Sequence, residues 1–147
     1  MEAQDLNRQG IAAAQRGEFQ LAIGHYQRAI ELEPNCAEAW FNQGLAQAKL
    51  GEFSSAEQSL KKTIGIRNDI GMVHQSLGKL RLQLNRADEA IEPFQQAVSL
   101  SPNRLEPLLQ LALAQWKSVE TLQAIASYQQ ALTVDPKSVE ALVNLAA

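Results

Sequence analysis

The chain has 147 residues, a hydrophobic content of 46% and a formal net charge of −3. This length is typical of one domain, and this hydrophobic content is enough for a continuous core, so the composition excludes a disordered chain. The negative net charge excludes a general binder of nucleic acids or anionic membranes, because such proteins need a basic face.

The chain carries no sign of export or membrane insertion. Its single cysteine, Cys36, cannot form an internal disulfide, which favours a reducing compartment. The first residues, Met1–Asp5, have neither the basic start nor the apolar core of a secretory signal. No apolar run approaches the roughly eighteen residues that span a membrane. We therefore predict a cytoplasmic protein without membrane contacts.

A spacing of 34 residues recurs along the whole chain. It is kept by small residues at two positions and by bulky residues at a third. The three series are Gly10, Gly44, Gly78 and Ala112; Ala22, Ala56, Ala90 and Ala124; and Tyr26, Leu60, Phe94 and Tyr128. A fixed period of this length is typical of stacked repeat proteins. It predicts an all-α fold, an α-α superhelix (solenoid) of stacked antiparallel helix hairpins.

We place all residues, 1–147, in one array. Its four full repeats are residues 3–36, 37–70, 71–104 and 105–138, and residues 139–147 begin a fifth. Each repeat has the pattern of two helices. In the second repeat the apolar stripes predict helices at about Ala37–Leu50 and Glu52–Ile66, separated by Gly51.

Turn and breaker residues punctuate the repeats in order. Gly17, Gly51 and Asn85 stand between the two helices of the first three repeats, and both residue types tolerate the left-handed conformation that ends many helices. Val119 stands there in the fourth repeat and predicts an altered turn. Proline ends three of the repeats, at Pro34, Pro102 and Pro136. A further proline, Pro93, lies inside a predicted helix and should bend it near Glu89.

The order of residues within a repeat resembles the tetratricopeptide repeat family. That family alternates a bulky residue, a small residue, a glycine turn, an alanine, an aromatic residue, another small residue and a terminal proline. The second repeat carries this order at Trp40, Gly44, Gly51, Ala56, Leu60 and Thr63, and the first at Leu6, Gly10, Ala22, Tyr26, Ala29 and Pro34. The resemblance covers nearly the whole chain. It implies that the first helix of each repeat lines a concave groove.

The resemblance also selects the residues that would line this groove. One polar residue per repeat would form a row, namely Arg8, Asn42, Ser76, Gln110 and Asn144. Beside the row lie apolar residues, Phe41, Leu45, Leu82, Leu109, Leu113 and Trp116, and basic residues, Lys49, Lys79 and Lys117. In related arrays of O-linked sugar transferases an asparagine ladder holds a peptide backbone here, and only Asn42 and Asn144 match it. The alternatives are that the polar row is merely solvated and that Trp116 packs against the preceding repeat.

One subset of the family clamps the C-terminal carboxylate of chaperones with lysines, asparagines and an arginine. At those places this chain has Asn7, Ile11, Asn42, Met72 and Ser76. Only Asn42 fits, so we do not expect this clamp.

We find no catalytic residues in the sequence. The two histidines, His25 and His74, lie in different repeats, and no cysteine or carboxylate cluster has metal-ligand spacing. His74 stands at the bulky packing position, which favours the core. We therefore predict a protein that is not an enzyme and has no metal site and no cofactor.

The sequence thus predicts a non-catalytic scaffold that binds an extended peptide or a helix of a partner protein in its concave groove. One alternative is an N-terminal substrate-selecting or targeting region of a larger enzyme, such as a glycosyltransferase or methyltransferase. Another is self-association through the exposed end of the array. The incomplete fifth repeat favours a fragment of a longer protein over a natural C-terminus with a short cap.

Overall fold

The computed structural model describes residues 2–118 and 120–146, and every regular element among them is an α-helix. The predicted altered turn at Val119 lies outside the described residues. The chain divides into two compact units, Met1–Asp69 and Ile70–Ala147. No described helix is long and apolar enough to cross a membrane.

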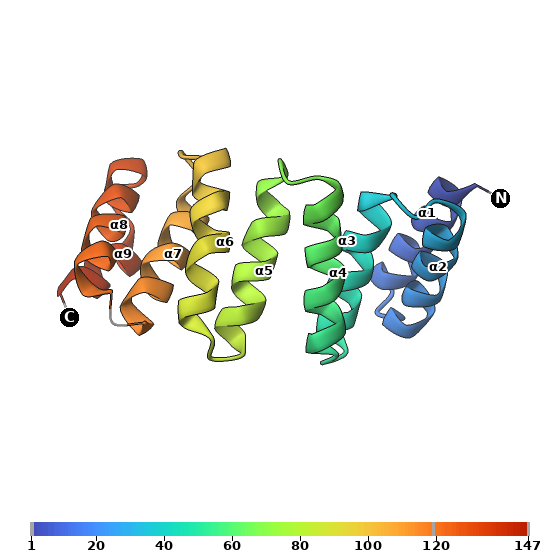
Figure 1. Cartoon of the computed structure of the whole chain (residues 1–147). Coiled ribbons are helices and arrows are strands. Elements are labelled where there is room, and N and C mark those ends of the chain that lie inside the picture. Colours follow the sequence, from blue (N-terminus) through green and yellow to red (C-terminus); the bar gives the residue numbers. More distant parts are fainter. Residues whose placement is uncertain (1, 119, 147) are drawn as a thin grey trace. The chain divides into compact units, whose positions relative to one another are not determined.

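Each unit contains two antiparallel helix pairs, and in the second unit a single helix, α9, follows them (Figure 1). The first unit contains α1 (Ala3–Gln15), α2 (Phe19–Leu32), α3 (Ala37–Lys49) and α4 (Phe53–Ile66). The second contains α5 (Gly71–Gln83), α6 (Ala87–Leu100), α7 (Leu105–Lys117), α8 (Thr121–Val134) and α9 (Val139–Ala146). Within each unit every helix packs on the next one along the chain, and the first helices of consecutive pairs also touch, α1 on α3 and α5 on α7.

The turns between paired helices adopt the conformation that the sequence predicts. Gly17 and Gly51 have φ of 79°, and Asn85 has φ of 59°. At Gly51 the backbone N–H bonds to the carbonyl oxygen of Ala48, and the next N–H, of Glu52, bonds to that of Gln47. These two bonds form a Schellman motif, which satisfies carbonyls that a helix end otherwise leaves unpaired.

Small residues let the two helices of a hairpin approach closely. The alanines of the second helices, Ala22, Ala56, Ala90 and Ala124, are all fully buried. A side chain at Gly10 would meet the ring of Tyr26, since a Cβ atom there would lie 2.4 Å from its Cε1 atom. The bulky series is buried as well: Tyr26 is 2% exposed and Phe94 is fully buried. The 34-residue pattern therefore marks the hairpin core.

Candidate functional site

The predicted groove residues lie on the first helices of the hairpins, and the two units present them separately. In the first unit, α1 and α3 lie side by side, and an open cavity of about 260 Å³ lies between them. Three predicted residues, Asn42, Leu45 and Lys49, line it from α3. The remaining lining residues come from α1, α2 and α3 and are Ile11, Ala14, Gln15, Phe19, Tyr26 and Ala46.

The cavity is largely apolar, with few polar groups. Tyr26, 2% exposed, belongs to a buried cluster with Ala46 and is flanked by the half-buried Ile11, Ala14 and Phe19. Burial raises the pKa of Tyr26. Narrow apolar concavities with a few polar groups are typical of binding sites.

A chain of polar side chains crosses from α1 to α3 beside this cavity. The Nδ2 atom of Asn42 donates to Oδ1 of Asn7 at 3.1 Å. The Nδ2 atom of Asn7, which is only 2% exposed, donates in turn to Oε2 of Glu38 at 3.3 Å. Asn42 therefore holds the neighbouring hairpin with one donor and keeps its remaining amide positions for other partners.

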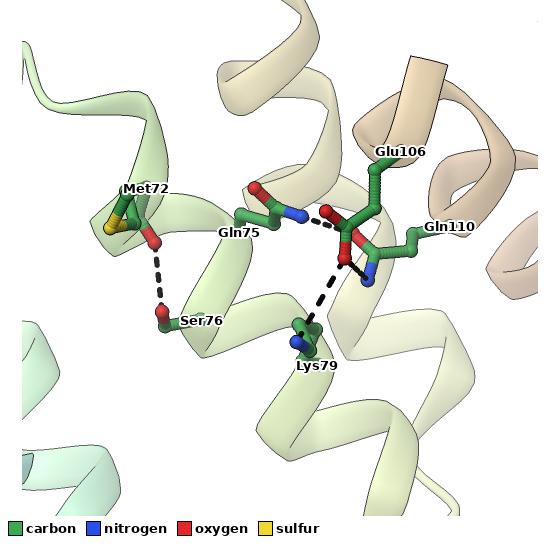
Figure 2. Close-up of polar contacts among 6 residues, drawn as sticks. All are labelled: Met72, Gln75, Ser76, Lys79, Glu106 and Gln110. Atoms are coloured by element: carbon green, nitrogen blue, oxygen red, sulfur yellow. Dashed lines mark hydrogen bonds and ion pairs between the residues drawn. The ribbon is translucent and has the colours of Figure 1, made fainter. Parts of the chain in front are cut away.

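The second unit repeats this arrangement with longer side chains, as Figure 2 shows. The Nε2 atom of Gln75 on α5 donates to Oε1 of Gln110 on α7 at 2.8 Å. Gln110 donates to Oε1 of Glu106 at 3.4 Å, and the same oxygen lies 4.0 Å from Nζ of Lys79. Lys79 and Gln110 thus belong to one network that links the first helices of two hairpins.

The rest of the predicted polar row also has partners within the protein. Arg8 lies 3.6 Å from the carboxylate of Asp5. The hydroxyl of Ser76 donates to the carbonyl oxygen of Met72, one turn earlier on the same helix (Figure 2). The Nδ2 atom of Asn144 donates to the Tyr128 hydroxyl at 3.1 Å. Asn42, Ser76, Gln110 and Asn144 therefore take part in the hydrogen bonding of the fold, whereas Arg8 has an exposed ion pair.

The predicted apolar residues differ in their exposure. Leu45 is 39% exposed and Trp116 is 43% exposed, whereas Phe41 and Leu113 are half-buried. Leu109 is buried in a cluster with Leu108 and Tyr128, so it belongs to the core and is left out of the candidate site. Lys49 and Lys117 are exposed.

Six cavity residues were missed by the sequence reasoning. Ile11 had a usable signal, since it stands one repeat before Leu45, which was selected. Tyr26 was assigned only to packing, and the remaining residues carry no chemical signal of their own. Ala14 becomes visible only by comparison with the larger Leu82 at the same position two repeats later.

No group of histidine, cysteine and carboxylate side chains among the described residues could hold a metal ion. His74 is buried, as its packing position predicts, and His25 is half-buried on α2. Cys36 is also buried, in a cluster with Ala3, Leu6, Ala29 and Ala39, so its thiol packs as an apolar group.

Three comparisons with known proteins bear on this fold. A curated relative, small glutamine-rich tetratricopeptide repeat-containing protein 2 of Mycosarcoma maydis, is 29% identical over 102 residues, covering 69% of this chain and 29% of its own length. A solved structure of YrrB, described as a TPR protein with an unusual peptide-binding site, superposes with a TM-score of 0.89 at 20% identity, covering 98% of this chain and 74% of YrrB. The structure of the first TPR of Spaghetti (RPAP3) bound to the HSP90 peptide SRMEEVD superposes with a TM-score of 0.75 at 20% identity, covering 80% of this chain and 96% of that one.

The chain spans between 16% and 51% of the length of the curated relatives it matches. The solved structures are too distant in sequence to show more than the fold, and they confirm an all-α helical-repeat fold of the solenoid class. Models of the tetratricopeptide repeat match residues 7–71, 73–104 and 105–138. Since these matches cover most of the chain, this protein belongs to the tetratricopeptide repeat family.

Proposed function

We propose that this protein is a non-catalytic scaffold that binds an extended segment or a helix of a partner protein along the face of its first helices. The observation that carries the proposal is the cavity between α1 and α3, because three of the predicted groove residues, Asn42, Leu45 and Lys49, meet on its wall. Clustered apolar groups with convergent polar groups are more typical of a partner site than of plain surface.

The first helices of the second unit carry residues of the same kinds. Trp116 is 43% exposed on α7, and tryptophan is enriched among residues that dominate binding energies. The exposed Lys117 lies on a first helix too, which suits a partner with acidic residues. The peptide-binding descriptions of YrrB and of the first TPR of Spaghetti favour the same class of partner here.

Nucleophilic or acid–base catalysis needs a nucleophile and a base within hydrogen-bond reach of each other. The buried Cys36, just before α3, and the buried His74, on α5, lie in different units and serve as packing residues. A net charge of −3 speaks against nucleic acid as the partner.

A capture experiment tests this proposal. Leu45→Glu/Trp116→Glu places charge on the first helices of both units. Leu21→Glu/Leu122→Glu is a matched control, since these leucines are 48% and 80% exposed on the second helices α2 and α8. We expect proteins captured from a lysate by the wild type and the control to be lost by the first-helix variant. Loss with the control alone would move the site to the second helices and contradict the proposal.

These substitutions are preferable to an alanine at Asn42. Removal of that amide would also leave Asn7 without its donor, so lost binding would be confused with lost stability. Leu45 and Trp116 are exposed, and helical content measured by circular dichroism checks that the variants fold.

A further inference from the structure

The cavity between α1 and α3 has the size of a side-chain site. Its volume of about 260 Å³ lies below the roughly 300–1,000 Å³ of small-molecule and cofactor sites. Its walls are formed mainly by apolar side chains, namely Ile11, Ala14, Phe19, Leu45 and Ala46. Such a space favours one apolar group over a cofactor or a polar metabolite.

The cavity exists because the first hairpin has a small residue where the third has a large one. Leu82, two repeats after Ala14, packs against a buried cluster that contains Phe94 and Ala114. Tyr26 and Ala46 occupy the corresponding positions beside Ala14. The methyl group of Ala14 is too short to fill the volume that a leucine fills in the third hairpin. The first hairpin therefore lacks one aliphatic side chain.

The buried tyrosine of this cavity is unlike its counterpart three repeats later. The Tyr128 hydroxyl accepts a hydrogen bond from Asn144, whereas Asn42, at the equivalent place, turns to Asn7 instead. No hydrogen bond joins the Tyr26 hydroxyl to another described residue, and its oxygen is not among the fully buried side-chain atoms that lack a partner. The hydroxyl is therefore accessible, and a main chain or side chain bound in the cavity can donate a hydrogen bond to it or accept one from it.

The charge at the cavity has one sign. Among the described lining residues Lys49 alone is charged, and it forms no ion pair with another described residue. An unpaired ammonium beside an apolar space is complementary to a carboxylate that lies close to an apolar side chain.

We propose that this cavity accepts one large aliphatic side chain, of leucine, isoleucine or methionine, from a partner segment that carries Asp or Glu within a few residues of it. The aliphatic group takes the place that Leu82 fills in the third hairpin, and the carboxylate pairs with Lys49. This inference rests on the proposed function and specifies the chemistry of its partner.

The chain offers matched variants. Ala14→Leu introduces the residue that the third repeat already accommodates, so it should fill the cavity without disturbing the fold. Ala12→Leu adds the same side chain to α1 at an exposed position and is the control. Lys49→Gln removes the charge and keeps most of the length of the side chain.

The probe is a displayed library of random linear peptides, selected on the wild type. We expect enriched sequences to share an aliphatic residue with Asp or Glu nearby. A synthetic peptide with an enriched sequence should lose about ten- to hundredfold in affinity when its aliphatic residue is replaced by alanine. This comparison needs no variant of the protein. Ala14→Leu should lower the affinity for this peptide at least tenfold, and Ala12→Leu should lower it less than about twofold. Lys49→Gln should lower the affinity about two- to fivefold. It should leave unchanged the affinity for a peptide in which Asp or Glu is replaced by Asn or Gln.

The outcomes separate this inference from the proposed function. Peptides that bind Ala14→Leu as well as the wild type, or that tolerate alanine at the aliphatic position, would overturn the anchor and leave the scaffold role intact. No enrichment over an uncoated surface would overturn both. Sedimentation without peptide tests a second copy of this chain as the occupant: a dimer that Ala14→Leu dissociates would contradict the inference.

Discussion

The guanidinium of Arg81 on α5 donates a hydrogen bond to the backbone carbonyl oxygen of Glu89 on α6 at 3.0 Å. Four residues after Glu89 stands Pro93, which has no N–H to donate to that carbonyl. Even so, α6 continues from Ala87 to Leu100. The neighbouring helix thus supplies the donor that the proline removes, and this compensation keeps a proline inside a helix.

This relationship predicts coupling between Arg81 and Pro93. Arg81→Met should lower the free energy of unfolding by about 1 kcal/mol, because the Glu89 carbonyl loses its donor. In a Pro93→Ala background the restored N–H can bond to Glu89, so the same substitution should cost less. Urea denaturation of the wild type, both single variants and the double variant measures the coupling. Equal costs of Arg81→Met in both backgrounds would contradict it.

In the fourth repeat, Gln115 and Ser127 stand at the positions that Arg81 and Pro93 occupy in the third repeat. The hydroxyl of Ser127 on α8 donates to Oε1 of Gln115 on α7 at 2.7 Å, and both side chains are buried. Ser127→Ala should therefore lower the free energy of unfolding by about 1–3 kcal/mol, since the Gln115 oxygen stays buried without a donor. The exposed Ser99→Ala is the control. A cost below that of the control in urea denaturation would show that the bond contributes nothing.

The glycines of the first helices should respond differently to the same substitution. At Gly10 a Cβ atom would lie 2.4 Å from the Tyr26 ring, and at Gly78 2.6 Å from the Phe94 ring. At Gly44 the nearest atom would be 3.2 Å away, on Ser59. Gly→Ala gains about 1 kcal/mol of helix propensity, so the sign depends on the clash.

We expect Gly10→Ala and Gly78→Ala to destabilise by about 1–3 kcal/mol through overpacking, and Gly44→Ala to be clearly milder. Thermal unfolding of the three variants measures the order. A larger loss at Gly44 than at Gly10 would contradict the packing described here.

The fold was predictable because its signals are local and repeated. The positions of Gly51 and Asn85 predict turns without any knowledge of the tertiary structure, and the alanine series identifies the buried stripe. The candidate site was only partly predictable. Spacing places Asn42 and Leu45 on one face, but the Asn7–Asn42 bond and the cavity beside Ala14 depend on how two hairpins pack. No feature of a single repeat reveals a space between two.

The Asn42 amide should contribute to stability as well as to any binding. Asn42→Ala removes the donor to the buried Asn7, so we expect a loss of about 1 kcal/mol in the free energy of unfolding. Urea denaturation measures it, and the exposed Gln20→Ala on α2 is the control. A variant as stable as the wild type would show that the Asn7–Asn42 bond is dispensable, which would leave binding as the role of Asn42.

The two tyrosines should titrate above their usual pKa of about 10. Burial raises the pKa of Tyr26. Burial is also the main cause of the raised pKa of Tyr128, and the charge of Glu140 raises it further, whereas the hydrogen bond with Asn144 lowers it. Because the folded state holds each phenolic proton more tightly than the unfolded state, the stability that this contributes is complete below about pH 10. It is lost as the pH rises from there through the folded pKa.

Since the chain has 2 tyrosines, Tyr26→Phe reports Tyr128 alone and Tyr128→Phe reports Tyr26 alone. We expect tyrosinate absorbance in each variant to appear only above pH 10, or together with the loss of helical circular dichroism. Each substitution should also make stability fall less steeply with pH in that range, because one titrating group is gone. Ionisation at or below pH 10 in a fully helical variant would mean that the remaining ring is solvated, which would contradict its burial between the two helices of its hairpin.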